Sequence, residues 1–275
     1  MTDEPTERPV RDVPHALDDF EALLAAVGDR RPALFLDYDG TLTPIVERPD
    51  LAVLSEEGRR MVAETARRLP TAVVSGRDRP DVEKLVDLED MIYAGSHGFD
   101  IRLPDGRILD HGMGEDVHEH LHRAVDQLRE RLMAVPGALV EAKKFSVAAH
   151  YRQVNDDDYP AFRAAVDAVM AEVPGLKEKP GKKVVEIQPD FDWDKGKAVD
   201  WLLKTLALDG PDVAAFFFGD DVTDEDAFRA LWQRDGIGVV AATADEDRTT
   251  TAHFRVDDPG QVHQLLGRLG DAFGR

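Results

Sequence analysis

The sequence predicts an α/β fold: a Rossmann-like core with a parallel sheet, and a smaller α+β unit inserted into that core. At both ends of the 275-residue chain, short apolar runs alternate with segments of helical periodicity, which is typical of a parallel sheet covered by helices. In the middle of the chain, helices alternate with hairpins instead. We therefore expect a core domain of residues 1–100 and 188–275, and an inserted domain of residues 101–187.

The N-terminal half of the core should contain three buried strands and three helices. Apolar residues at helical spacing predict the helices, and short unbroken apolar runs predict strands that are buried on both faces. Gly28 ends the first helix, and Ser55 is a suitable N-cap for the second. The expected order is helix 16–27, strand 33–36, helix 56–69, strand 71–76, helix 81–88 and strand 91–98.

The inserted domain has a different pattern. Asp105-Gly106 and Pro180-Gly181 are turn signals that each predict a hairpin. The insert should contain hairpin 99–110, helix 115–135, paired strands in 138–152, helix 159–173 and hairpin 176–189. The core pattern then resumes with helix 195–208, strand 213–219, helix 224–232, strand 236–240 and a last strand and helix.

Composition limits the function. The chain has 55 acidic and 34 basic residues, a formal net charge of −21, and such a field repels nucleic acids and anionic lipid surfaces. We expect no nucleic-acid partner and no membrane partner. The polar first 14 residues have no apolar signal-peptide core and suggest a loose start. There is no cysteine, which agrees with a cytoplasmic location and excludes thiolate metal sites.

Four polar clusters lie where core strands should end. They are "DYDGT" after the first strand, "SGR" after the second, "DKGKA" at a helix start, and "GDDVTDED" after "AAFFF". Ligands of open parallel sheets bind beyond the carboxyl ends of the strands, so the four clusters can converge on one site. Taken singly, the first is also typical of a turn and the last of an acidic helix N-terminus.

The motifs "LDYDGTLTPI", "VVSGR", "YAGSHGFDI", "VEAKKFSVAAHYR", "KKVVEIQP" and "GDDVTDEDAF" resemble those of the haloacid dehalogenase (HAD) superfamily and, within it, the trehalose-6-phosphate phosphatase family. They span both the core and the insert. The resemblance implies a HAD core, with the insert as the cap that determines substrate specificity. The segment "QPDFDWDKG" departs from the family pattern, because Trp193 and acidic residues replace its customary glycine.

The resemblance also implies roles for the core residues. Side chains at i and i+2 of an extended backbone share one side, so Asp37 and Asp39 can both face a ligand. Asp37 would attack phosphorus, and Asp39 would protonate the leaving group. Mg²⁺ suits such oxygen ligands. The implied site comprises the catalytic residues Asp37, Asp39, Ser75 and Lys195, the phosphate-binding or loop-ordering Arg77, and the metal residues Asp37, Asp39, Asp220, Asp221 and Asp224.

In the insert, the resemblance places sugar-binding residues at Glu141, Lys143, Lys182 and Glu186. Carboxylates accept hydrogen bonds from sugar hydroxyls and ammonium groups donate to them, which suits a disaccharide. Without the resemblance, the same residues would equally fit the ordinary charged faces of hairpins.

The expected activity is Mg²⁺-dependent hydrolysis of trehalose 6-phosphate through an aspartyl-phosphate intermediate. The alternatives are a phosphatase or mutase for another sugar phosphate, such as sucrose phosphate or mannosylphosphoglycerate, and a non-catalytic phosphosugar sensor. His118 and His122 have the i, i+4 spacing of a zinc pair but lack an evident third ligand. No GxxxxGK[ST] loop is present, which disfavours a kinase of that class.

Overall fold

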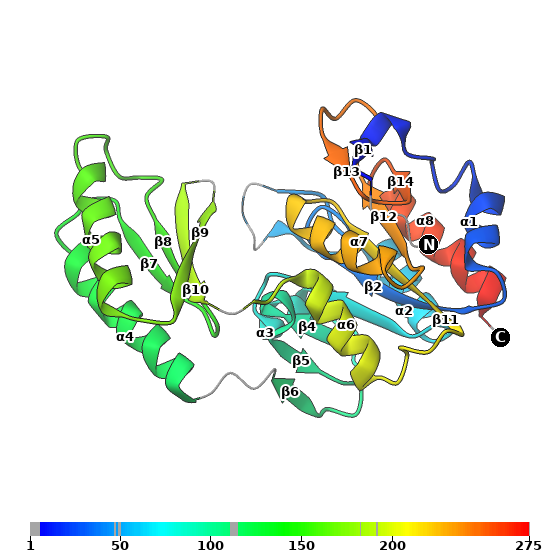
Figure 1. The fold of residues 1–275 in the computed structure, drawn as a ribbon, viewed down its shortest axis with the longest axis horizontal. Coiled ribbons are helices and arrows are strands. Elements are labelled where there is room, and N and C mark those ends of the chain that lie inside the picture. Colours follow the sequence, from blue (N-terminus) through cyan, green and yellow to red (C-terminus); the bar gives the residue numbers. More distant parts are fainter. Residues whose placement is uncertain are drawn as a thin grey trace. The chain divides into compact units, whose positions relative to one another are not determined.

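The computed structural model describes residues 6–46, 48, 51–110, 115–181, 183–190 and 192–274. The chain divides into two compact units (Figure 1): Met1–Leu109 with Trp193–Arg275 form the first, and Asp110–Asp192 form the second. Among the described residues, no helix is both long enough and apolar enough to cross a bilayer.

An eight-stranded sheet forms the centre of the first unit, in the order β14-β12-β11-β2-β3-β4-β5-β6. Six strands are parallel, and β5 runs antiparallel to β4. The strands are β2 (Arg31–Leu36), β3 (Thr71–Val74), β4 (Ile92–Gly95), β5 (Asp100–Arg102), β6 (Ile108–Asp110), β11 (Val213–Gly219), β12 (Ile237–Ala241) and β14 (Phe254–Val256). The predicted α/β fold with a parallel-dominated sheet is confirmed.

The position of β2 in the sheet determines which loops lie next to each other at the carboxyl edge. It pairs with β3, the next core strand along the chain, and with β11, which lies far away in sequence. Leu36 stands opposite Phe218 in this register. The residues that follow β2 and β11 therefore emerge side by side at the carboxyl edge of the sheet.

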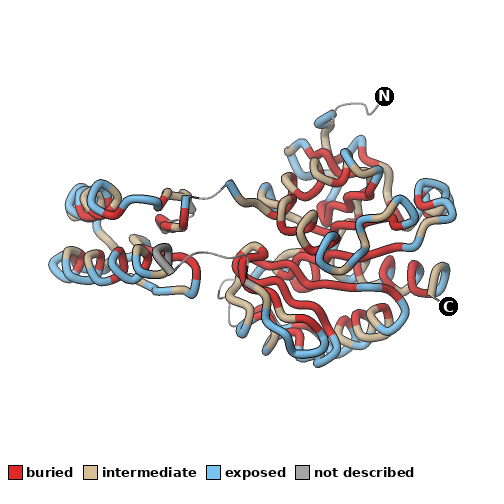
Figure 2. Tube along the Cα trace, turned by 60° about the horizontal axis from the view of Figure 1, so that its bottom comes forward, coloured by how far each residue is buried: buried red, intermediate tan, exposed pale blue. Residues whose placement is uncertain are grey.

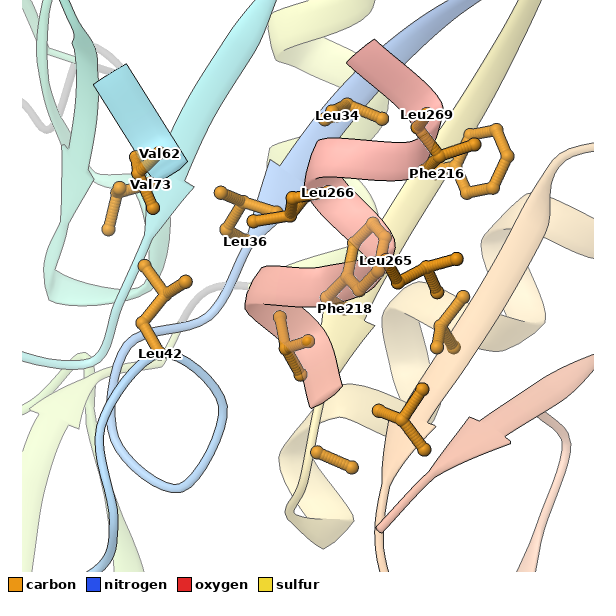
Figure 3. Close-up of a cluster of buried hydrophobic side chains, with 14 of the residues drawn as sticks. Leu34, Leu36, Leu42, Val62, Val73, Phe216, Phe218, Leu265, Leu266 and Leu269 are labelled. Atoms are coloured by element: carbon orange, nitrogen blue, oxygen red, sulfur yellow. The ribbon is translucent and has the colours of Figure 1, made fainter. Parts of the chain in front are cut away.

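Helices cover both faces of the sheet. Strand residues alternate between the faces, so Leu36 and Phe218 pack in a different cluster from Phe35 and Phe217. The first face is covered by α1 (Phe20–Val27), α2 (Glu56–Ala66), α3 (Arg79–Val86) and α8 (Pro259–Phe273). Figure 3 shows α8 lying across this face, with Leu265, Leu266 and Leu269 in the same cluster as Leu34, Phe216 and Phe218 of the sheet.

The opposite face of the sheet packs against α6 (Lys195–Thr205) and α7 (Glu225–Trp232). Phe217 of β11 meets Phe228 of α7 edge to face, with ring centroids 5.9 Å apart. Every residue of β2 after Arg31 and every residue of β11 is buried, and Figure 2 shows long buried stretches, coloured red, through the inside of this unit. This rigid sheet is the scaffold for the loops at its carboxyl edge.

The second unit is a four-stranded antiparallel sheet with two helices, in the strand order β7-β8-β10-β9. Its elements are α4 (Glu115–Leu132), β7 (Leu139–Ala142), β8 (Val147–His150), α5 (Tyr159–Glu172), β9 (Leu176–Gly181) and β10 (Val184–Pro189). Both helices lie on one side of this sheet (Figure 1), and they pack there on Val147, Ala149, Val185 and Ile187.

The boundary between the units differs from the expected one. Residues 99–110 do form a hairpin around Asp105-Gly106, but β5 pairs with β4 and so extends the sheet of the first unit. The second unit therefore begins at Asp110 instead of residue 101, and it ends at Asp192 instead of residue 187. The roles of the two units as catalytic core and cap stay a prediction.

Two smaller expectations were also wrong. Pro180 and Gly181 belong to β9, opposite Val185 and Val184, so the turn of that hairpin follows them. The chain start is not loose throughout, because β1 (Arg8–Pro9) pairs with β13 (Thr249–Thr250) and Val10 is fully buried.

Phe217 of β11 allows a test of the packing between the sheet and α7. Phe217→Ala should lower the free energy of unfolding by about 3–5 kcal/mol, because the change leaves a cavity between the sheet and α7. Chemical denaturation monitored by circular dichroism measures this loss. Val222→Ala is the matched control, since Val222 is 72% exposed and its loss should stay within about 0.5 kcal/mol. Equal effects of the two changes would contradict the packing.

Candidate active site

The loop after β2 brings Asp37 to the sheet edge. The backbone N–H of Asp37 donates to the carbonyl of Phe218, at 2.9 Å, and so ties this loop to the end of β11. Asp37 is only 4% exposed. Next to it, the buried Tyr38 donates its hydroxyl to the carbonyl of Ala52, at 2.6 Å, which anchors the loop beneath the site.

Gly40 lets this loop approach the loop that follows β11. Its φ is +78°, and a Cβ added there would lie 2.0 Å from Oδ2 of Asp220. A side chain at this position is excluded both by the backbone conformation and by the close approach. Thr41 then donates its hydroxyl to Oδ1 of Asp220, at 3.4 Å. The predicted convergence of these two motifs is therefore present.

Lys195 lies between two carboxylates. It is the first residue of α6 and is 4% exposed. Its Nζ is 3.1 Å from Oδ1 of Asp37 and donates to Oδ1 of Asp224 at 2.5 Å. Burial alone would lower the pKa of Lys195, but the charges of Asp37 and Asp224 outweigh it and raise that pKa above its usual range. Lys195 is therefore a permanent buried cation.

Asp224 orders the loop after β11. It is fully buried, and its Oδ2 accepts the backbone N–H groups of Asp220 and Asp221, each at 2.9 Å. Since its Oδ1 already accepts from Lys195, both oxygens are in use. Asp221 is exposed, and its Oδ1 accepts from the backbone N–H of Val222 at 2.7 Å. Asp221 therefore caps the short 3₁₀ helix Val222–Asp224.

Three carboxylates are close enough to share a cation. Ligand oxygens of Asp37, Asp220 and Asp224 lie within 4.8 Å of one another. Burial, and then the charges of Asp224 and Asp221, raise the pKa of Asp220 to about 7. Burial also raises the pKa of Asp37 well above its usual value, although Lys195 opposes this shift. These carboxylates repel one another when they are ionised. A divalent cation bound between them would relieve this repulsion, and a set of oxygen donors alone fits Mg²⁺.

The second strand end carries Ser75 and Arg77. Ser75 is 1% exposed, and its Oγ accepts the backbone N–H of Arg77 at 3.1 Å. Arg77 binds the carboxylate of Asp39 in a bidentate pair, with both N···O distances at 2.6 Å. Its guanidinium also lies 5.5 Å from the centroid of the Tyr38 ring. Arg77, expected as a phosphate-binding or loop-ordering cation, is thus engaged by Asp39 of the loop after β2 in this structure.

Trp193 and Asp194 hold the segment before Lys195, which departs from the family pattern. Trp193 donates its indole N–H to the carbonyl of His97, at 3.0 Å, and its ring packs against Phe99. Asp194 caps α6 by accepting the backbone N–H of Lys197, at 2.8 Å. The sequence reasoning missed this role of Trp193. An aromatic residue directly before a helix cap was the available signal.

Three of the four predicted sugar-binding residues lie together in the second unit. Lys143 donates to Oε1 of Glu186 at 3.2 Å, and the hydroxyl of Ser146 donates to the same oxygen at 2.7 Å. Glu141 pairs with Nε2 of His150, at 2.9 Å. Glu141 and Glu186 both stand opposite Ala148, on either side of β8. Lys182, the fourth, lies outside the described residues.

The chain is similar to proteins of one known family. The sequence profile of the trehalose-phosphatase family matches residues 35–260. Trehalose-phosphate phosphatase B of Arabidopsis thaliana is 39% identical over 266 residues, which cover 93% of this chain and 71% of that protein.

Solved structures show the fold. The C-terminal domain of trehalose-6-phosphate phosphatase from C. albicans superposes with a TM-score of 0.71 at 23% identity, over 94% of this chain and 98% of that one. A haloacid dehalogenase-like hydrolase from Bacteroides thetaiotaomicron superposes with a TM-score of 0.63 at 13% identity, over 87% and 100%. The fold is therefore that of HAD-like hydrolases.

The raised pKa of Asp220 predicts how pH acts on the metal-free protein. The folded carboxyl keeps its proton up to a pH of about 7, whereas an unfolded aspartate loses it near pH 3.9. Because the folded state then binds the extra proton, its free energy of unfolding should fall as pH rises from about 4 to about 7. In thermal melts with EDTA, the melting temperature should fall less between about pH 4 and about pH 7 for Asp220→Asn than for the unaltered protein.

Magnesium should reverse this trend by binding the folded state. We expect Mg²⁺ to raise the melting temperature of the unaltered protein, and to raise it more at pH 8 than at pH 5.5, because the ligands must be deprotonated. Asp220→Asn should abolish the Mg²⁺ shift, whereas the exposed control Asp221→Asn should keep most of it. An undiminished shift in Asp220→Asn would exclude Asp220 as a ligand.

Proposed function

Because the chain belongs to the trehalose-phosphatase family, we propose that it hydrolyses trehalose 6-phosphate to trehalose and inorganic phosphate. The observation that carries this proposal is the cluster of the buried residues Asp37, Lys195 and Asp224 with the partly buried Asp220 at the carboxyl edge of the sheet. A nucleophile, a fixed cation and a place for a divalent ion lie together there. A phosphoryl group needs all three.

Asp37 is the proposed nucleophile. One of its carboxylate oxygens forms a bond to phosphorus while the bond between phosphorus and the sugar oxygen breaks, which leaves an aspartyl-phosphate and gives the electron pair of the broken bond to the sugar oxygen. Lys195, 3.1 Å from Asp37, favours the ionised form of this carboxylate against the effect of burial and adds positive charge near the equatorial phosphate oxygens. Ser75 can donate its hydroxyl to one of those oxygens.

Asp39 is the proposed acid and base. In the first step its proton passes to the sugar oxygen, so that trehalose leaves as a neutral alcohol. In the second step Asp39 takes a proton from the water that attacks phosphorus, and phosphate departs as Asp37 is restored. The bidentate contact with Arg77 holds the ionised carboxylate of Asp39, which is the form that accepts a proton in the second step. Arg77 is therefore proposed to orient Asp39 as well as to attract phosphate.

We propose Mg²⁺ as the cofactor, held by Asp37 and Asp220 and by the backbone carbonyl of Asp39. The ion supplies charge that neutralises the phosphate and favours its binding. Asp224 and Asp221 are proposed to position these ligands, Lys195 and metal-bound water without binding the ion directly. The contacts of Asp224 with Lys195 and with two backbone N–H groups support an organising role for it.

The second unit is proposed to act as the cap that recognises the sugar. Glu141, Glu186 and Lys143 lie on one face of its sheet, and Lys182 remains a proposed sugar-binding residue. Their carboxylates and ammonium groups suit the hydroxyls of a disaccharide. The absence of cysteine supports a cytoplasmic location, which stays a prediction.

Asp37→Asn tests the nucleophile. The amide keeps the size of the side chain but cannot attack phosphorus, so kcat on trehalose 6-phosphate should fall by more than about 10⁴-fold. Phosphate release measures turnover, and circular dichroism with a thermal melt checks that the fold persists. Turnover within tenfold of the unaltered protein would exclude Asp37 from this role.

A panel of phosphosugars tests the substrate. Trehalose 6-phosphate should be turned over with a kcat/KM at least about 100-fold above that of glucose 6-phosphate, since the latter offers fewer hydroxyls to the cap. Glu186→Gln should reduce kcat/KM for trehalose 6-phosphate more than for p-nitrophenyl phosphate. A higher kcat/KM on sucrose phosphate or mannosylphosphoglycerate would show that trehalose 6-phosphate is not the preferred substrate. No metal-dependent turnover of any phosphosugar would favour a sensor.

A further inference from the structure

The sheet of the second unit carries a row of four residues directly opposite one another. Glu141 on β7 pairs with Ala148 on β8, Ala148 pairs with Glu186 on β10, and Glu186 pairs with Lys179 on β9. Paired residues of an antiparallel sheet project their side chains to the same face. The row therefore places Lys179 on the same face as the two glutamates.

This face is the one that the helices of the unit leave uncovered. The alternate residues of the same strands, among them Val147, Val185 and Ile187, are buried under α4 and α5. Successive strand residues point to opposite faces. Glu141, Glu186 and Lys179 therefore project away from those helices, and all three are at least partly exposed.

Ala148, in the middle of the row, has the smallest side chain of the four residues. It is 2% exposed, and its methyl group lies between the longer side chains of Glu141 and Glu186. Strands are spaced about 4.8 Å apart, so the row from Glu141 to Lys179 extends over roughly 14 Å. This width exceeds a single sugar ring and suits a ligand with two rings.

Lys179 differs from its neighbours in having no partner. Glu186 is engaged from the side of β7 and β8 by Lys143 and Ser146, and Glu141 is engaged by His150. Within the described part of the chain, the side chain of Lys179 makes no hydrogen bond or ion pair, although its residue stands directly opposite Glu186. Its three ammonium donors are available to a ligand on this face.

We propose that Lys179 is a further substrate-binding residue, which donates hydrogen bonds to the hydroxyls of the second sugar ring and so favours a disaccharide phosphate over a monosaccharide phosphate. This inference rests on the proposed function and adds a residue that the motifs did not indicate. Lys179 touches the sugar and not the phosphate. Its contribution therefore concerns binding, with the phosphoryl steps unchanged.

The test compares three substitutions. Lys179→Met removes the donors but keeps the length of the side chain, and should raise KM for trehalose 6-phosphate about tenfold with kcat within twofold, the loss expected for a hydrogen bond to a charged group. KM for p-nitrophenyl phosphate should not change. Lys179→Arg keeps donors and should restore most of the affinity. Lys204→Met, at an exposed position on α6, controls for the lost charge and should change neither constant.

Two outcomes would overturn the inference: a KM for trehalose 6-phosphate that stays within twofold in Lys179→Met, or equal effects of Lys179→Met and Lys204→Met. Failure of the proposed substrate is a separate result, seen with the unaltered protein alone. If that protein prefers another phosphosugar, the same three substitutions measured on the preferred sugar decide whether Lys179 binds it. A thermal melt of each variant excludes unfolding as the cause.

Discussion

The charge of Lys195 is buried between the carboxylates of Asp37 and Asp224, and the arrangement of the site depends on these two contacts. Removing one partner of such a group leaves an uncompensated buried charge, which is strongly destabilising. The contacts join the loop after β2, the loop after β11 and the start of α6. Asp224 then holds the backbone of Asp220 and Asp221, so one ammonium group indirectly positions the acidic loop beside Asp37.

The sheet makes this contact possible. Since β2 lies between β3 and β11, its carboxyl end meets residues that follow two other strands, and these are Ser75 on one side and Asp220 on the other. Gly40 allows the two acidic loops to come within contact distance, because no side chain fits between them. The second unit has a polar sheet face of its own, on which Glu141, Glu186 and Lys179 share one row.

Much of this arrangement could be predicted from local sequence. Apolar runs and capping residues placed the core strands and helices, and Ser55 indeed caps α2 by accepting the backbone N–H of Gly58. The hairpin of residues 99–110 was recognised but assigned to the wrong unit, because its turn is encoded locally and its pairing with β4 is not. The Arg77–Asp39 pair and the contact of Trp193 with His97 are likewise long-range, and no spacing in the sequence indicates them.

The central claim is that the carboxylate of Asp37 takes the phosphoryl group. Rapid acid quenching of the protein during turnover of a phosphosugar labelled with radioactive phosphate, followed by peptide mapping, tests it most directly. The account predicts label on the peptide that contains Asp37, in an acyl phosphate that alkaline hydroxylamine cleaves. Label on a different peptide, or no covalent label at any time during efficient turnover, would contradict it.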